Sequence, residues 1–224
     1  MGKEIDLLAK YPRTTRDIET RGATKTLEDI AIARKFGVDF FDGDRRYGYG
    51  GYSPDADRWR GVVDDIILEY GEINSFLDIG CGKGGLVRAV KDRLPRCLAH
   101  GVDISNYAIT AGKEAHKGVI HRQDLRTLDV RDLAGEPYTY QRYDLVVSIN
   151  TIHNLPRFGC LRALDNIQAI GKRAFVMVDA YKTVEEEQRL RDWNLTALTL
   201  LHVDDWLKLF SEAGYAGDYG WWLP

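Results

Sequence analysis

Several features that would place a protein in a class at once are missing from this sequence. The three cysteines form no CxxC pair and are odd in number, so neither a disulfide framework nor a zinc knuckle is indicated. No apolar run is long enough to span a bilayer, and the first ten residues contain no apolar segment typical of a signal peptide. We therefore expect a cytoplasmic protein without a membrane partner.

An excess of basic residues is also missing. The 224 residues include 31 Lys and Arg against 34 Asp and Glu, a net charge of −3. Broad binding to nucleic acid rests on clustered Lys and Arg, so no nucleic-acid partner is expected. The histidines form no HxxxH or HExxH pattern, and no metal site is predicted.

What the sequence does contain is an alternation of strand and helix patterns from residue 75 onward. Short apolar runs at 75–80, 98–104, 143–150 and 173–180 alternate with longer segments of helical periodicity. This alternation predicts an α/β fold with a doubly wound, mostly parallel sheet and helices on both faces. Before it, residues 24–36 and 57–71 are predicted as helices.

The ends of three predicted strands carry acids, and the first also carries glycines. In "FLDIGCGKGG" (76–85), Asp78 precedes glycines that let the backbone turn sharply against a ligand. Asp103 ends the next strand, where an acid can bind a ribose diol, and Asp124 ends the third, where an acid can accept from an adenine amino group. Since Asp78 would repel a pyrophosphate, a cationic nucleoside, S-adenosylmethionine, is favoured over a dinucleotide.

The ordered segments "FLDIGCGKGG", "HGVDIS", "RQDL" and "YDLVVSINTIHNL" resemble the motifs of class I S-adenosylmethionine-dependent methyltransferases. The resemblance covers residues 75–224. It implies a Rossmann-like sheet of seven strands whose last strand, in "GDYGWWLP", is antiparallel, and S-adenosyl-L-homocysteine as the product. It also divides the chain into an N-terminal helical segment with a lid (1–60) and a cofactor-binding methyltransferase domain (61–224). No (N/D)PP(Y/F) stretch follows the fourth strand, so methylation of adenine or glutamine amino groups is not supported.

Roles for individual residues follow from the same resemblance. The implied cofactor-binding residues are Asp78, Gly80, Cys81, Gly82, Gly84, Asp103, Ile104, Asp124, Leu125 and Asn150. The implied catalytic residues, at the ends of the fourth and fifth strands, are Asn150, His153 and Asp179. His153 is the natural general base, since the ordinary pKa of histidine lies near neutrality.

A second glycine-rich stretch, "RRYGYGGY" (45–52), precedes the first motif. Its glycines permit hinge motion and its tyrosine faces favour a cationic methyl group. We therefore predict a lid that closes the same cavity and shields the sulfonium from water. The predicted lid and acceptor-binding residues are Tyr47, Tyr49, Tyr52, Trp59, Arg60 and Tyr181, and Arg45, Arg46, Arg58 or Arg60 is expected to pair with a carboxylate of the cofactor or the acceptor.

The predicted function is transfer of a methyl group to nitrogen or oxygen of a small polar metabolite by in-line displacement, by a monomer or homodimer. A lid rich in aromatic and arginine side chains suits an enclosed pocket for a small molecule. Three alternatives stay open: a peptide or RNA acceptor, a protein that binds the cofactor without turnover, and a nicotinamide-dependent oxidoreductase.

Overall fold

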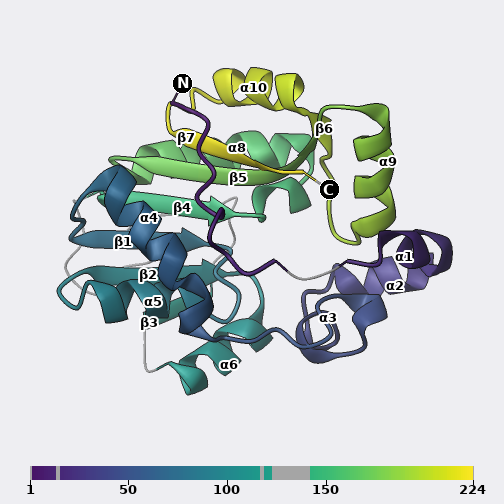
Figure 1. Ribbon diagram of the computed structural model, residues 1–224, viewed down its shortest axis with the longest axis horizontal. Helices are drawn as coiled ribbons and strands as arrows, with labels where there is room; N and C mark the ends of the chain where they lie inside the picture. Colours follow the sequence, from purple (N-terminus) through teal and green to yellow (C-terminus); the bar gives the residue numbers. More distant parts are fainter. Residues whose placement is uncertain (1, 14–15, 117–118, 123–141, 224) are drawn as a thin grey trace.

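A single parallel sheet with helices on both faces forms the centre of the computed structural model (Figure 1). The structure describes residues 2–13, 16–116, 119–122 and 142–223. The strands are β1 (Ser75–Ile79), β2 (Leu98–Asp103), β3 (Val119–Arg122), β4 (Leu145–Ile149), β5 (Ala174–Tyr181), β6 (Leu201–His202) and β7 (Asp218–Trp222). The predicted alternation of strands and helices after residue 75 is confirmed.

The order of the strands creates a point at which the winding of the chain reverses. Across the sheet the strands follow the order β3-β2-β1-β4-β5-β7, and the two-residue β6 pairs only with the last two residues of β5. From β1 the chain proceeds to β2 and β3 on one side and to β4 and β5 on the other. In such sheets a ligand crevice lies outside the carboxyl ends of the strands at this reversal.

The predicted antiparallel last strand is wrong. β7 runs parallel to β5, from Phe175 opposite Asp218 to Asp179 opposite Trp222. Between the two strands the chain passes through α9 (Val184–Trp193) and α10 (Val203–Glu212). Such a helical crossover returns the chain to the end of the sheet from which β5 started, so the next strand is parallel.

The free edge of β7 is covered by the N-terminal residues. The N–H of Ile5 donates to the carbonyl of Tyr219 (2.8 Å), and the N–H of Tyr219 donates to the carbonyl of Lys3 (3.1 Å). Both ends of the described chain therefore meet at one edge of the sheet (Figure 1). Covering an edge strand satisfies backbone groups that would otherwise be open to pairing with another chain.

Two apolar layers hold the helices to the sheet. Phe76, Leu145 and Phe175 face α4 (Arg60–Tyr70) and α5 (Gly85–Arg93), while their neighbours in sequence face α8 (Arg157–Ile170) and α10. This alternation is the period of two expected of strands covered on both faces. Helix α6 (Asn106–Ala115) lies beside β2 and β3.

The N-terminal segment lies beyond the carboxyl ends of the strands, where the crevice is expected (Figure 1). It comprises α1 (Ile18–Thr24), α2 (Leu27–Ala33), α3 (Val38–Asp42) and the 3-10 turns η1 (Arg45–Tyr47) and η2 (Ala56–Trp59). Helix α1 packs against α9, with Gly22 close to Asp192. The predicted helix at 24–36 is shorter, because Thr26 caps α2 in a capping box with Asp29.

No helix in the described part of the chain is long and apolar enough to cross a membrane.

Candidate functional site

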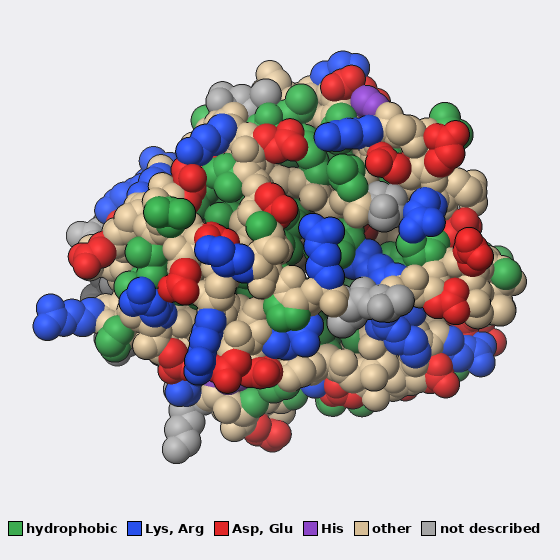
Figure 2. Space-filling view, viewed as in Figure 1, with side chains coloured by type: hydrophobic (Ala, Val, Ile, Leu, Met, Phe, Trp, Pro, Cys, Tyr) green, Lys and Arg blue, Asp and Glu red, His purple; other side chains and the backbone are tan. Residues whose placement is uncertain are grey.

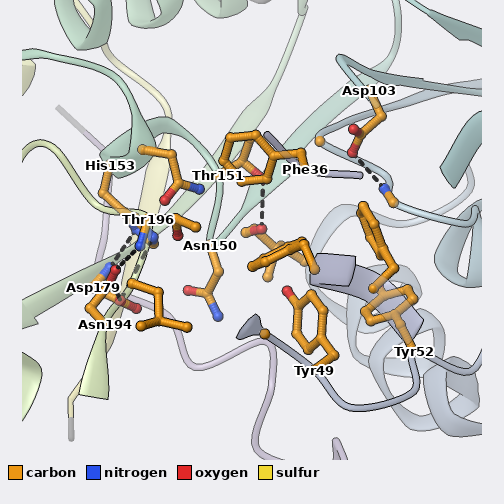
Figure 3. Close-up of a pocket in the computed structure, with 18 of the residues that line it drawn as sticks. Phe36, Tyr49, Tyr52, Asp103, Asn150, Thr151, His153, Asp179, Asn194 and Thr196 are labelled. Carbon is orange, nitrogen blue, oxygen red and sulfur yellow. Dashed lines mark hydrogen bonds and ion pairs between the residues drawn. The ribbon is translucent and has the colours of Figure 1, made fainter. Parts of the chain in front are cut away.

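A cavity of about 330 Å³ lies between the carboxyl ends of the strands and the N-terminal segment (Figure 3). The sheet contributes residues at and just after the carboxyl ends of β1, β2, β4 and β5. The N-terminal segment contributes mostly aromatic rings. The sheet-side residues include Asp78, Gly80, Cys81, Gly82, Asp103, Ile104, Asn150, Thr151, His153 and Asp179, and the rings are Phe36, Phe40, Phe41, Tyr49, Tyr52 and Trp59.

The loop after β1 is built by glycines in the left-handed region of backbone conformation. Gly80 and Gly82 have φ of +82° and +54°, values that side chains disfavour. The N–H groups of Gly80 and Cys81 donate to the carbonyl of Val102 (2.8 and 3.0 Å) and hold the loop against β2. A Cβ on Gly80 would overlap the side chain of Thr151, so the loop lies in direct contact with the end of β4.

Two buried acids lie beside this loop. Asp103 accepts from the N–H groups of Gly82 (2.9 Å) and Ser105 (2.8 Å). Burial raises the pKa of Asp103, and these two hydrogen bonds lower it in part. Burial, and next the charge of Asp103, raise the pKa of Asp78 to about 8. A site with two carboxyl groups of this kind is stabilised by a ligand that brings positive charge.

The segment after β4 presents buried oxygens without partners. Asn150 has a φ of +52°, and its N–H donates to the carbonyl of Met177 (2.9 Å). Among the described residues, neither Oδ1 of Asn150 nor Oδ1 of Asn154 has a hydrogen-bond partner. Leaving a buried acceptor unpaired costs about 1–3 kcal/mol, and both side chains line the cavity. These oxygens therefore indicate a ligand that donates hydrogen bonds.

His153 and Asp179 form a buried polar group at the other end of the cavity. Nδ1 of His153 accepts from the N–H of Asp179 (3.0 Å), and Nε2 lies 3.7 Å from Oδ2 of Asp179. The same carboxylate oxygen accepts from Nδ2 of Asn194 (2.6 Å). Figure 3 shows these three side chains together, across the cavity from Asp103 and Tyr52.

This geometry argues against the predicted role of His153 as general base. Burial lowers the pKa of His153, which favours the neutral ring. Because Nδ1 accepts a hydrogen bond, the proton of the neutral ring lies on Nε2. Neither nitrogen then has a free lone pair, and the ring is arranged to donate from Nε2.

The two glycine-rich stretches contact each other directly. A Cβ on Gly82 would lie 3.2 Å from the ring of Tyr52, and a Cβ on Gly85 would lie 2.9 Å from Nε1 of Trp59. The rings of Tyr49 and Tyr52 are 4.7 Å apart and face the cavity (Figure 3). Both stretches therefore line one cavity, while opening and closing of the earlier one stays a prediction.

Comparison with known proteins agrees with the fold. Residues 77–173 match a family described as "Methyltransferase domain". Residues 77–173 therefore carry a methyltransferase domain. Within the described residues, no three His, Cys, Asp or Glu side chains gather as they would around a metal ion.

Two curated methyltransferases are similar to parts of this chain. Over 85 residues the chain is 39% identical to trans-aconitate 2-methyltransferase of Mycolicibacterium gilvum, covering 38% of this chain and 29% of that protein. Over 170 residues it is 25% identical to methyltransferase ungE' of Aspergillus campestris, covering 66% and 49%. The chain thus spans less than half the length of the curated relatives it matches.

A solved structure shares the fold over most of both chains. It is magnesium protoporphyrin IX methyltransferase of Synechocystis PCC 6803 with bound S-adenosylhomocysteine, with a TM-score of 0.55. The two chains are 17% identical, and the match covers 82% of this chain and 88% of that one.

Several of the predicted site residues lie away from the cavity. Arg60 pairs with Asp57 at the surface (2.7 Å), Tyr47 lies under the guanidinium of Arg46, and Tyr181 packs against His202. Gly84 caps the N-terminus of α5 in a left-handed conformation, and its N–H donates to the carbonyl of Cys81 (2.9 Å). Asp124 and Leu125 lie outside the described residues.

Two other lining residues were not predicted from the sequence. Arg16 and Arg21 line the cavity beside the ring of Trp193. Arg16 and Arg21 belong to a segment without any motif, and the packing of α1 against α9 brings them to the cavity. The aromatic run "VDFFDGD" was visible in the sequence, and Phe40 and Phe41 from it line the cavity.

Proposed function

We propose that this protein transfers a methyl group from S-adenosylmethionine to oxygen or nitrogen of a small polar acceptor inside this cavity. The observation that carries the proposal is the difference between the two ends of the cavity. One end has a glycine loop and two buried acids, Asp78 and Asp103. The other has His153, Asp179 and Asn194 beside arginines.

The residues at the first end fit the cofactor. Asp103 would hold the ribose hydroxyls, and the backbone from Gly80 to Gly82 would contact the methionine part. The unpaired Oδ1 of Asn150 would accept from the ammonium group. When bound, S-adenosylmethionine supplies a methyl group on a positively charged sulfur. Asp124 and Leu125 remain the proposed contacts of adenine.

The size of the cavity favours a small acceptor. About 330 Å³ is at the lower end of the range for ligand pockets, and cofactor and acceptor would share this space. A peptide or an RNA would need an open groove instead. The name of one relative, trans-aconitate 2-methyltransferase, supports a small acceptor, although the match covers only part of that protein.

The main catalytic contribution of the chain would be alignment of the reacting atoms, which can lower the activation barrier by several kcal/mol. Nε2–H of His153 would donate to the acceptor. The N–H of Asp179 would hold the ring of His153 in place, and Asn194 would hold the carboxylate of Asp179. The faces of Tyr49 and Tyr52 would stabilise the positive charge near the methyl group.

A turnover assay tests the proposal. Purified protein is mixed with methyl-labelled S-adenosylmethionine and pools of small acids, amines and alcohols, with peptide and RNA pools run in parallel. The expected result is labelled product and S-adenosylhomocysteine with one class of small molecule. Label in the peptide or RNA pool alone would overturn the proposal that the acceptor is a small molecule. Cofactor binding without label in any pool would favour a protein that binds the cofactor without turnover.

A further inference from the structure

Three arginines surround one tryptophan at the acceptor end of the cavity. The guanidinium carbons of Arg16, Arg21 and Arg45 lie 4.9, 4.2 and 5.3 Å from the ring centre of Trp193. Arg16 also lies over Trp222, at 4.3 Å. Figure 2 shows Lys and Arg side chains gathered on this face where the N-terminal segment meets the sheet.

In the part of the chain that the structure describes, these arginines form no hydrogen bond or ion pair with an acidic side chain, although the charge of Asp179 acts on Arg16. Arg21 and Arg45 donate only to backbone carbonyls, including those of Gly48 and Tyr49. Arg16, which is half-buried, makes ring contacts and no hydrogen bond or ion pair with a described residue. By contrast, the neighbouring Arg46 pairs with Asp29 at 2.8 Å.

The charge at this end of the cavity is therefore unbalanced. Three guanidinium groups face one carboxylate, Asp179, which already accepts a hydrogen bond from Asn194. Burial, and next the charges of Arg45 and Arg16, lower the pKa of Arg21 to about 10. Partly buried like charges repel one another, and a bound anion would remove this repulsion.

The arginines lie far from the ribose end of the cavity. Asp103 ends β2 and Asp179 lies near the end of β5, and these two strands are three positions apart in the sheet. Neighbouring strands are about 4.8 Å apart, so these ends are separated by about 14 Å. Since Trp193 follows β5 through α9, the arginines belong to the acceptor side of the site.

We propose that the acceptor is a small anion with at least two carboxylates, held by Arg16, Arg21 and Arg45 and methylated on a carboxylate oxygen. This inference rests on the proposed function. A guanidinium matches a carboxylate with two parallel hydrogen bonds. One carboxylate of the acceptor would bind the arginines, and another would point toward the methyl group.

Methylation of a carboxylate also agrees with the state of His153. A carboxylate oxygen forms a bond to the methyl carbon while the carbon–sulfur bond breaks and its electron pair stays on sulfur. The products are a methyl ester and S-adenosylhomocysteine, and no proton moves. No general base is required, and the bonded Nδ1 of His153 leaves none in this ring.

Calorimetric titration of the full chain, saturated with S-adenosylhomocysteine, tests the inference. The probes are tricarballylate and glutarate, with glutaramide as the uncharged match of glutarate. We expect at least one of the two anions to bind and glutaramide not to bind. In Arg16→Gln the affinity for that anion falls at least tenfold, and the affinity for S-adenosylhomocysteine changes less than threefold.

Two further variants keep the result interpretable. Arg16→Lys keeps the charge without the paired donors and should show intermediate affinity for the anion. Arg157→Gln removes an exposed arginine that pairs with Glu212 on the surface and should change nothing.

Each contrary outcome has a distinct meaning. If Arg16→Gln lowers the affinity for S-adenosylhomocysteine as much as the affinity for the anion, the arginines bind the carboxylate of the cofactor and the inference is wrong. If S-adenosylhomocysteine binds but neither anion does, or if glutaramide binds equally well, the inference fails while the proposed function stands. If wild-type protein does not bind S-adenosylhomocysteine, the proposed function itself fails.

Discussion

At the scale of single residues, Asp78 should make the stability of the unliganded protein depend on pH. Its pKa is about 8 in the folded chain and near 3.8 when unfolded, so the folded state binds the proton more tightly. The stabilisation from protonated Asp78 is complete below about pH 3.8 and is lost as pH rises toward 8. We expect Tm to fall less steeply between pH 5 and 8.5 in Asp78→Asn than in wild type, measured by calorimetry. Equal slopes would contradict the burial of an uncharged Asp78.

Replacing Gly80 should reduce ligand affinity more than it reduces the stability of the fold. Gly80→Ala places a Cβ where Thr151 already lies and forces a left-handed φ on alanine. Gly71→Ala imposes similar strain, since Gly71 has a φ of +70°, but its Cβ would meet no atom within 4 Å. We expect Gly80→Ala to lower the affinity for S-adenosylhomocysteine at least tenfold. Gly71→Ala should cost about 1 kcal/mol of stability and leave the affinity unchanged.

His153 should contribute to positioning and not to proton removal. A general base supplies about 10²- to 10⁴-fold in rate, whereas loss of one positioning hydrogen bond costs less. Asparagine can still accept from the N–H of Asp179. We therefore expect kcat of His153→Asn to stay within about tenfold of wild type, with an unchanged pH profile. A thousandfold drop in kcat, together with loss of an ionisation from the pH profile, would show that His153 is the general base after all.

At the scale of elements, one carboxylate connects the N-terminal segment to the glycine loop after β1. Asp42, at the end of α3, accepts from Nζ of Lys83 (2.8 and 2.6 Å), from the N–H of Tyr52 (3.0 Å) and from the hydroxyl of Tyr107. The side chain of Lys83 is only 8% exposed, so its ammonium group would lose its partner in Asp42→Asn. Breaking such a pair is costly because the remaining charge stays buried.

The expected result of Asp42→Asn is weaker cofactor binding and a looser lid. The Kd for S-adenosylhomocysteine should rise about tenfold, which corresponds to about 1.4 kcal/mol. Proteolysis within residues 45–52 should become faster. Asp39→Asn, an exposed acid on the same helix, is the matched control. Equal cleavage rates in the two variants would show that this ion pair does not hold the segment.

At the scale of the whole molecule, local patterns in the sequence predicted the features that depend on neighbouring residues, namely the strands and the acids at their ends. The period of the apolar residues identified the strands, and the strand-end acids Asp78 and Asp103 were expected at one edge because parallel strands end together. The direction of β7 was not predictable in this way, since it depends on how α9 and α10 cross the sheet. The positions of Arg16 and Arg21 depend on the packing of α1 against α9, which no motif encodes.

The most direct test of the central assignment is calorimetric titration of the purified protein with S-adenosylmethionine and S-adenosylhomocysteine. Wild type should bind both at one site with micromolar affinity. Asp103→Ala should weaken binding at least tenfold, because the carboxylate that we propose to hold the ribose, and that accepts from the N–H of Gly82, is lost. Asp205→Ala, an exposed acid on α10 that pairs with Lys208, should bind like wild type. Absence of binding to wild type, or equal binding to Asp103→Ala, would contradict a cofactor site at the glycine loop.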